Sequence, residues 1–199
     1  MDEVREQAER DYQLASGLSQ DVETDDNVFR QTTARLPWLL IGMLGGIGNS
    51  MILGNFDSTF AAHPEMALYI PLIGGTGGNV GTQSSALVVQ GLANSSLNAE
   101  NTFKQVLKES VVALINATII SMLVYIYNFI RFGATATVSY SVSISLFAVV
   151  MFASIFGTLV PMTLEKLKID PAIATGPFIS ITNDIIGMLM YMGITVLLS

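Results

Sequence analysis

The sequence predicts an all-α integral membrane protein with five transmembrane helices, a cytoplasmic N-terminus and a C-terminus outside. Three observations support this fold class: long apolar segments, a scarcity of charge after residue 30, and lysines gathered in alternate loops. Only 13% of the 199 residues are charged, which is about half the share of a soluble globular domain. Residues 1–30 hold nine acidic residues and three arginines, so the net charge of −7 arises mostly there.

Residues 1–35 are expected to form a cytoplasmic acidic helical arm, and residues 36–199 a transmembrane domain. Apolar side chains recur at helical spacing between residues 2 and 15, which predicts a short amphipathic helix. Residues 16–26 are polar and predict a turn or loop. The arm is either a solvated helix or a juxtamembrane segment that docks on something. It lacks the basic and then apolar pattern of a cleavable signal peptide.

Five segments have the roughly 20 apolar residues that are needed to cross about 30 Å of hydrocarbon. They cover about 36–54, 65–92, 107–130, 140–164 and 171–198. Pro37 occupies an expected helix-start position in the first segment, and Asp170 and Pro171 are the expected N-cap and first residue of the fifth. Serines alternate with apolar residues over 137–145, which alone would favour a strand. An isolated strand in lipid would leave its backbone unpaired, so we expect a helix whose serines face protein or water.

The basic residues indicate the orientation of these helices. Six of them fall at the entry to the first segment or in the loops after the second and fourth: Arg30, Arg35, Lys104, Lys108, Lys166 and Lys168. Only Arg131 falls in the loops after the first and third segments. The positive-inside rule therefore places the N-terminus in the cytoplasm of a multi-pass cell membrane protein.

Composition also excludes several classes of function. The absence of cysteine rules out disulfide scaffolds and thiolate metal sites, and the single histidine, His63, argues against His-rich zinc sites and catalytic triads. Nucleic acid is not an expected partner, because no stripe of basic residues could neutralise phosphates. No nucleophile–base pair or cofactor motif appears, so we do not expect an enzyme.

Asp184 lies near the middle of the fifth segment. A carboxylate at that depth costs about 3 kcal/mol, and no Lys or Arg near the midplane could pair with it. An ion site is favoured over a protonated structural aspartate. Small or polar residues share its helical face, and oxygen donors lie nearby: Gly176, Ser180 and Gly187, then Thr175, Thr182 and Asn183. Pro177 is expected to interrupt this segment and to free carbonyl groups near residue 173.

The second segment holds five glycines in eight residues: Gly74, Gly75, Gly77, Gly78 and Gly81. Their spacing fits neither a dinucleotide fingerprint nor a P-loop. One interpretation is helix packing through glycine pairs four residues apart, which also occur at Gly42 and Gly46. The other is that the glycines bring backbone carbonyls within reach of an ion, together with the polar side chains Asn79, Thr82 and Gln83. Asn79 and Asp184 could share one level, because each lies near the middle of its segment.

All these candidate ligands are oxygens, which favours a hard cation. A single carboxylate among neutral oxygens suits an ion that keeps most of its waters, as Mg²⁺ does. Two chains that met on a two-fold axis could share one cation between two Asp184 side chains.

With these residues in view, about residues 30–199 resemble the transmembrane domain of the MgtE family of magnesium channels and transporters. Three stretches carry the resemblance: Arg35-Leu36-Pro37-Trp38-Leu39-Leu40, then Gly77-Gly78-Asn79-Val80-Gly81-Thr82-Gln83, and Asp170-Pro171-Ala172 through Gly176-Pro177-Phe178 to Thr182-Asn183-Asp184-Ile185-Ile186-Gly187. The resemblance implies a homodimer whose pore lies between protomers and is lined chiefly by the second and fifth helices. Asn183 departs from the family pattern, which often has Thr or Ser there.

The resemblance further implies that Asp184 matches the family's central magnesium-binding aspartate, with Asn79 and backbone groups near Gly75 and Gly176 around a hydrated ion. The candidate metal-binding set is Asp184, Asn79, Gly75, Gly78, Gly176 and Ser180. Family members usually carry an N-terminal helical domain and a CBS pair that sense magnesium, and the arm at 1–35 resembles the helix that links the CBS pair to the membrane. The chain is thus expected to be a fragment of a longer protein or a natural short member.

The leading hypothesis is a dimeric, Mg²⁺-selective channel in the lipid bilayer that passes hydrated divalent cations. An alternative is a secondary carrier coupled to H⁺ or Na⁺, and a third is a membrane assembly subunit whose glycines only pack helices.

Overall fold

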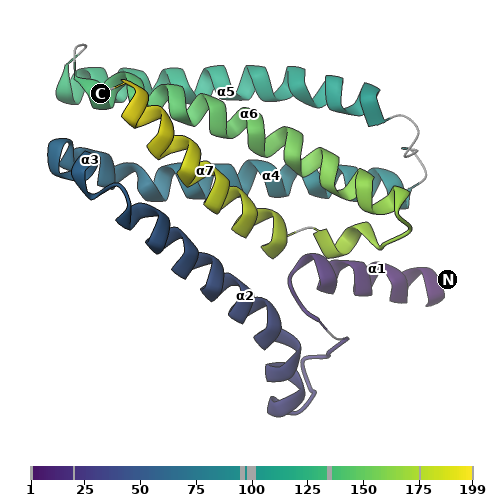
Figure 1. Cartoon of the computed structure of the whole chain (residues 1–199). Helices are drawn as coiled ribbons and strands as arrows, with labels where there is room; N and C mark the ends of the chain where they lie inside the picture. The colour runs from purple at the N-terminus through teal and green to yellow at the C-terminus, as the bar shows by residue number, and fades with distance from the viewer. Residues whose placement is uncertain are drawn as a thin grey trace.

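The computed structural model describes residues 2–19, 21–94, 97, 102–133, 136–174 and 176–198, and every regular element in them is helical (Figure 1). The all-α prediction is therefore confirmed. The elements are α1 (Asp2–Ala15), α2 (Val28–Gly54), α3 (Asp57–Ala62), the 3₁₀ helix η1 (Pro64–Tyr69), α4 (Ile70–Ala93), α5 (Thr102–Phe132), α6 (Thr137–Lys166), the 3₁₀ helix η3 (Pro171–Ala174) and α7 (Pro177–Leu198).

Among the described residues, four helices are long and apolar enough to cross a membrane, namely α2, α5, α6 and α7. The helix α4 has 24 residues and is long enough, but it is not one of the four. Its glycines and its Asn, Thr, Gln and Ser side chains interrupt the apolar run. The chain thus has the helices of a multi-pass membrane protein.

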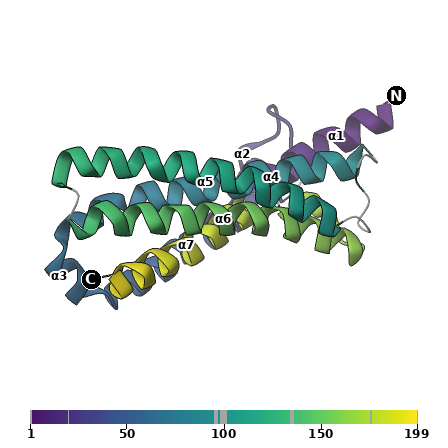
Figure 2. The ribbon, with the colours of Figure 1, turned by 90° about the horizontal axis from the view of Figure 1, so that it is seen from above.

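The helix α6 lies at the centre of the bundle and packs on α4, α5 and α7 (Figure 2). Within its apolar stretch 56% of the residues are buried, compared with none in the apolar stretch of α2. The serines of the alternating stretch, Ser139, Ser141, Ser143 and Ser145, are buried in this helix. Helix rather than strand is confirmed, and these serines face protein.

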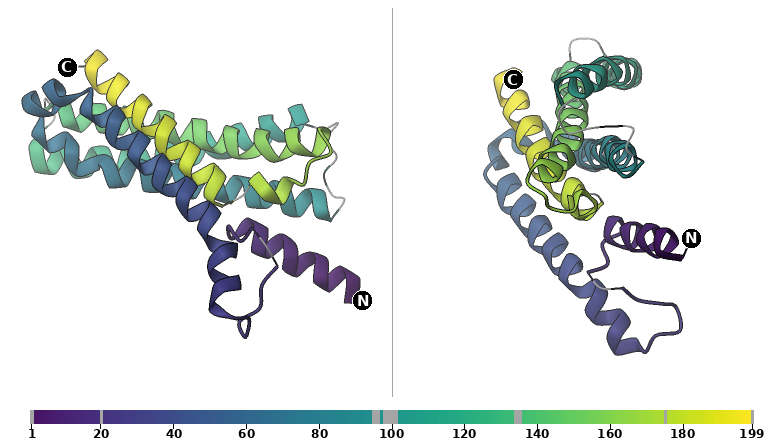
Figure 3. Two further views of the ribbon diagram at one scale, coloured as in Figure 1. Left: turned by 60° about the horizontal axis from the view of Figure 1, so that its bottom comes forward. Right: turned by 90° about the vertical axis from the view of Figure 1, so that its right-hand side faces the viewer.

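The helix α2 diverges from the bundle and packs mainly along α7 (Figure 3). Asn27 caps its first turn, because the side-chain Oδ1 accepts a hydrogen bond of 2.9 Å from the backbone N–H of Arg30. Pro37 lies inside this helix, so its prediction as a helix-start residue was wrong. The cap at Asn27 starts the helix in the polar stretch before the membrane segment, and membrane helices tolerate an interior proline.

Two of the expected segments are divided. The second consists of η1 followed by α4, and the fifth of η3 followed by α7. Asp170 caps η3 as predicted, since its Oδ1 accepts a hydrogen bond of 2.9 Å from the N–H of Ala172. Gly176 has a φ of +52°, a conformation that favours glycine, and it separates the two helices. Pro177 is the first residue of α7, so the fifth segment is interrupted immediately before it, at a helix start and not within a helix.

The arm forms the predicted helix α1 and docks on the start of α7. The backbone carbonyl of Ala15 touches Gly176, and a Cβ placed on Gly17 would lie 2.6 Å from Cγ of Pro177. The hydroxyl of Ser19 donates a hydrogen bond of 2.9 Å to the carbonyl of Ala34 in α2. The end of the arm is therefore held between α2 and the segment that precedes Asp184.

Candidate functional site

Asp184 is half-buried on α7 and faces two glycines of α4 that are one helical turn apart. A Cβ placed on Gly74 would lie 3.3 Å from Oδ1 of Asp184, and one on Gly78 would lie 3.6 Å from the same atom. Ser180 lies one turn before Asp184, and its hydroxyl would be 2.9 Å from a Cβ on Gly78. The missing side chains of Gly74 and Gly78 therefore make the space that Asp184 and Ser180 occupy.

Gly77 and Gly81 lie on a different face of α4 and serve close packing. A Cβ on Gly77 would lie 2.9 Å from Cγ1 of Val149 in α6, while one on Gly81 would overlap the amide of Asn183 in α7. A Cβ on Gly157 of α6 would overlap the carbonyl oxygen of Gly81. The packing interpretation thus holds for Gly77 and Gly81, whereas Gly74 and Gly78 adjoin the carboxylate.

Gly75 follows Gly74 and Asn79 follows Gly78, so both point about 100° away from those glycines around the axis of α4. Both are exposed in this chain, and a Cβ on Gly75 would meet nothing within 4 Å. No hydrogen bond joins Asn79 to Asp184 in the part of the chain that the structure describes. The structure therefore groups Asp184, Ser180, Gly74 and Gly78, and it leaves Gly75 and Asn79 on the adjoining open face.

Gly176 lies two turns before Asp184 and is in contact with the end of the arm. Its carbonyl accepts a hydrogen bond of 3.0 Å from the N–H of Ser180, which continues the helix into α7. Ala15 of the arm covers its Cα. Gly176 thus lies at the entrance to the Asp184 helix, where the fold brings no group of α4 into contact with it.

The other expected oxygen donors point elsewhere or cannot be placed. Asn183 is 1% exposed and packs against Gly81, so its amide lies in the α4–α7 contact. Gly187 packs against Val149, since a Cβ there would lie 3.3 Å from Cγ1 of that residue. Thr182 is half-buried, and Thr175 lies outside the described residues.

The glycines of α2 contact α7 close to Asp184. A Cβ on Gly42 would lie 3.8 Å from Cδ1 of Ile181, and one on Gly45 would lie 2.5 Å from its Cγ2. A Cβ on Gly46 would meet nothing within 4 Å. Gly45 is therefore the glycine of α2 that lies closest to α7, and helix packing through Gly42 and Gly46 stays a prediction.

The charge of the site comes from Asp184. Across the described ranges, no three His, Cys, Asp or Glu side chains are grouped so that they could hold a metal ion. The site therefore offers one carboxylate beside the Ser180 hydroxyl. Such an arrangement can hold an ion through its hydration shell, whereas a dehydrating cage needs more carboxylates.

Two features of this region did not follow from sequence reasoning. Gly74 was not in the candidate metal-binding set, although Gly74/Gly78 and Ser180/Asp184 share the four-residue spacing of two facing helix surfaces. Glu109 was not assigned a role either. It is only 9% exposed, and its Oε1 accepts hydrogen bonds from the hydroxyls of Ser84 and Ser154.

Comparison with known proteins places this geometry in context. A family model described as MgtE, divalent cation transporter, matches residues 70–194. The chain is 32% identical over 194 residues to the magnesium transporter MgtE of Bacillus subtilis (strain 168). The aligned region covers 98% of this chain and 43% of that protein. It is 33% identical over 165 residues to the protein of the same name from Thermus thermophilus, covering 83% and 36% of the two chains.

A third relative, the magnesium transporter MgtE of Enterococcus faecalis, is 28% identical over 194 residues, covering 98% of this chain and 42% of that protein. The chain spans about two fifths of the length of these curated relatives.

Proposed function

Because the chain belongs to the MgtE family of divalent cation transporters, we propose that it forms a Mg²⁺-selective membrane pore in which Asp184 binds the passing ion. The observation that carries this proposal is the position of Asp184 against Gly74 and Gly78, beside the open face of α4. A half-buried carboxylate in an apolar helix is costly, which makes a cation path a better explanation than packing.

We propose five membrane crossings, with α4 and η1 as the crossing that composition alone does not single out. The helix α4 runs alongside α6 and α7 (Figure 1), and its glycine face is covered by both. Its buried glycine and serine positions contact protein, so it needs less apolar surface than a helix that faces lipid. The basic residues of the loops support a cytoplasmic N-terminus and an outer C-terminus.

A homodimer would complete the site. Each chain supplies one carboxylate, and Gly75 and Asn79 lie uncovered beside it. Two copies on a two-fold axis would bring two Asp184 side chains to one ion and match its double charge. This arrangement puts α4 and α7 at the pore, and it accounts for the polar residues that α4 leaves exposed.

The proposed ion passes in hydrated form. Mg²⁺ loses its waters reluctantly and is usually held through only one or two carboxylates. A site with two aspartates, serine hydroxyls and glycine surfaces can contact the waters of such an ion without replacing them. The pore would then conduct passively and would need no coupled proton or sodium ion.

The test is Mg²⁺ uptake into liposomes, measured with an internal fluorescent indicator. Asp184→Asn is expected to lower the uptake rate at least tenfold, while Asp57→Asn, which alters an exposed acid in α3, should leave it unchanged. Equal uptake by the Asp184→Asn variant and the unaltered protein would refute the site. Dependence on an imposed H⁺ or Na⁺ gradient would establish the coupled carrier instead, and intact dimers without uptake would indicate an assembly subunit.

A further inference from the structure

A groove separates α4 from α5 on the side of the bundle away from α2. Both helices pack on α6, and Figure 3 shows them beside it in the right-hand view. The groove encloses about 580 Å³, and residues from α4, α5 and α6 line it. That volume falls within the range of ordinary ligand pockets. Its position is separate from the α4–α7 face that carries Asp184.

Glu109 provides a negative charge at the floor of this groove. Ser84 donates a hydrogen bond of 2.7 Å to its Oε1, and Ser154 donates a second to the same oxygen. Ser84 and Ser154 also lie 3.0 Å apart, so the two hydroxyls and the carboxylate form one buried cluster. Oε2 receives no hydrogen bond from the residues that the structure describes, and it is not one of the fully buried oxygens without a partner, so it is open to the groove. A hydrogen-bond donor that enters the groove can therefore reach it.

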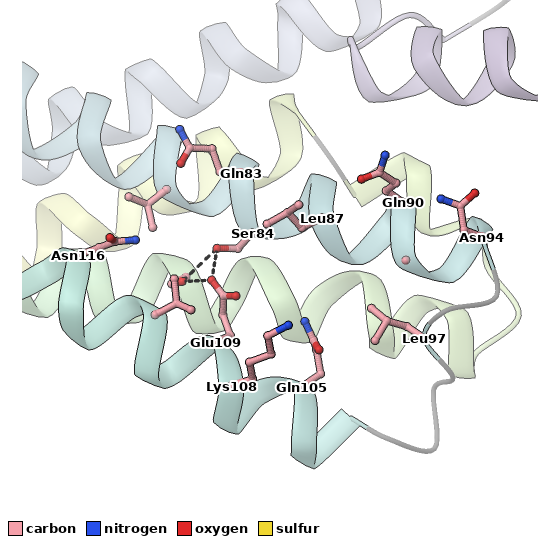
Figure 4. Close-up of a pocket in the computed structure, with 14 residues that line it drawn as sticks. Gln83, Ser84, Leu87, Gln90, Asn94, Leu97, Gln105, Lys108, Glu109 and Asn116 are labelled. Atoms are coloured by element: carbon pink, nitrogen blue, oxygen red, sulfur yellow. Dashed lines mark hydrogen bonds between the residues drawn. The ribbon is translucent and has the colours of Figure 1, made fainter.

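A positive charge lies at the edge of the same groove. Lys108 and Glu109 both extend from α5 into the space between α4 and α5 (Figure 4). Lys108 forms no ion pair with an acid of the described chain, so its ammonium group is available. Amide side chains surround the two charges, and they include Gln83, Gln90 and Gln105. The groove therefore presents one anionic group and one cationic group among hydrogen-bonding amides.

The rim of the groove is apolar and continues onto the outer surface of α5. Leu87 and Val112 line the opening, and the nearby Leu107 and Val111 of α5 are more than half exposed. The 31 residues of α5 span about 46 Å, which exceeds the hydrocarbon core by about 16 Å. Lys108 and Glu109 lie about 10 Å from its start, close to the level where lipid headgroups meet hydrocarbon.

We propose that this groove binds the headgroup of a zwitterionic phospholipid with a primary amine, of the phosphatidylethanolamine type. The lipid ammonium donates a hydrogen bond to Oε2 of Glu109, and its phosphate contacts Lys108. A free divalent cation fits less well because Lys108 lines the same space. An anionic headgroup fits less well because Glu109 would repel it, and a choline headgroup has no N–H to donate.

The test measures which lipids stay bound to the purified full chain. The protein is equilibrated with micelles that contain equal amounts of ethanolamine, choline and glycerol phospholipids with the same acyl chains, and retained lipid is measured by native mass spectrometry. The unaltered protein should retain the ethanolamine lipid at least fivefold over the choline lipid. Glu109→Gln should reduce that ratio to about one, while the amide oxygen still accepts the serine hydrogen bonds.

Lys108→Gln should lower retention of every phosphate-bearing lipid severalfold. The matched control is Lys104→Gln, which alters an exposed lysine of α5 outside the groove and should change nothing. A measurement without any variant uses lipids whose amine carries one, two or three methyl groups. Retention by the unaltered protein should fall in that order as donors are lost.

Several results would overturn the proposal. They are equal retention across the methylated series, an ethanolamine preference that survives in Glu109→Gln, or preferred retention of the glycerol lipid. Displacement of the ethanolamine lipid by millimolar Mg²⁺ would assign the groove to a cation instead. Equal competition by soluble phosphoethanolamine would show that the ligand need not be a lipid.

Discussion

Adding a methyl group to Gly74 or Gly78 should displace the side chain of Asp184 or Ser180 at the proposed ion site without unfolding the protein. In Gly78→Ala the new Cβ would lie 2.9 Å from the hydroxyl oxygen of Ser180, which is closer than real Cβ contacts and forces that side chain to rotate. In Gly74→Ala the Cβ would lie 3.3 Å from Oδ1 of Asp184, which shifts the carboxylate by a few tenths of an ångström.

The size of the effect follows from these displacements. A side chain forced off its preferred rotamer costs about 0.5–1.5 kcal/mol, which converts to about a two- to twelve-fold loss of affinity. The same methyl group improves helix propensity by about 0.5–1 kcal/mol, which offsets strain in the folded state. We therefore expect Mg²⁺ uptake at low concentration to fall by this factor in both variants, with an unfolding temperature within a few degrees of the unaltered protein.

The matched control is Gly46→Ala, because a Cβ there would meet nothing within 4 Å. Uptake is measured in liposomes over a range of Mg²⁺ concentrations, and thermal unfolding is followed in detergent. Suppose that Gly74→Ala and Gly78→Ala both transport Mg²⁺ as Gly46→Ala does, while Asp184→Asn abolishes uptake. The position of Asp184 against Gly74 and Gly78 would then be refuted as the ion-binding position. The carboxylate would then bind the ion from another position.

Three further predictions concern the scaffold. Gly157→Ala should destabilise the bundle by about 1–3 kcal/mol, since the methyl group would overlap the backbone of Gly81, and an unchanged unfolding temperature would contradict that contact. Tyr69→Phe removes the hydroxyl that donates to Oδ1 of the fully buried Asn128 at 2.5 Å and should cost about 1–3 kcal/mol, again measured by thermal unfolding. Asn27→Ala removes the α2 cap and should cost about 0.5–2 kcal/mol, so amide exchange should accelerate in the first turn of α2; equal exchange rates would exclude the cap.

The length of the apolar segments predicted the membrane helices well, because about 20 residues are needed to cross the hydrocarbon core. It located α5 and α6 to within a few residues. For the serines of α6, helix was preferred against the alternating pattern because lipid cannot satisfy the backbone of an isolated strand. The choice of Asp184 rested on the cost of a charge at membrane depth, which needs no three-dimensional information.

What sequence reasoning lacked was the rotation of one helix against another. Gly74 and Gly77 look alike in sequence, yet one adjoins Asp184 and the other adjoins Val149. For the same reason the sequence did not distinguish Gly45, which adjoins Ile181, from Gly46, where a Cβ would meet nothing within 4 Å. The break before α7 depends on the positive φ of Gly176 and on its contact with Ala15, which is distant in sequence. Partners at such separations have no local signature.

The polarity of α4 has a consequence for how the protein is made. With α4 as a membrane crossing, the surface that covers its glycine face comes from α6 and α7, which are synthesised later. Pro177 follows Ala93 by 84 residues, which takes a ribosome about 4–17 s to translate. Until α6 and then α7 have been synthesised, the polar positions of α4 lack their final neighbours. Its final placement is therefore a late step of biogenesis, and cells that lack membrane insertion chaperones should accumulate chains whose α4 remains accessible to water-soluble labels.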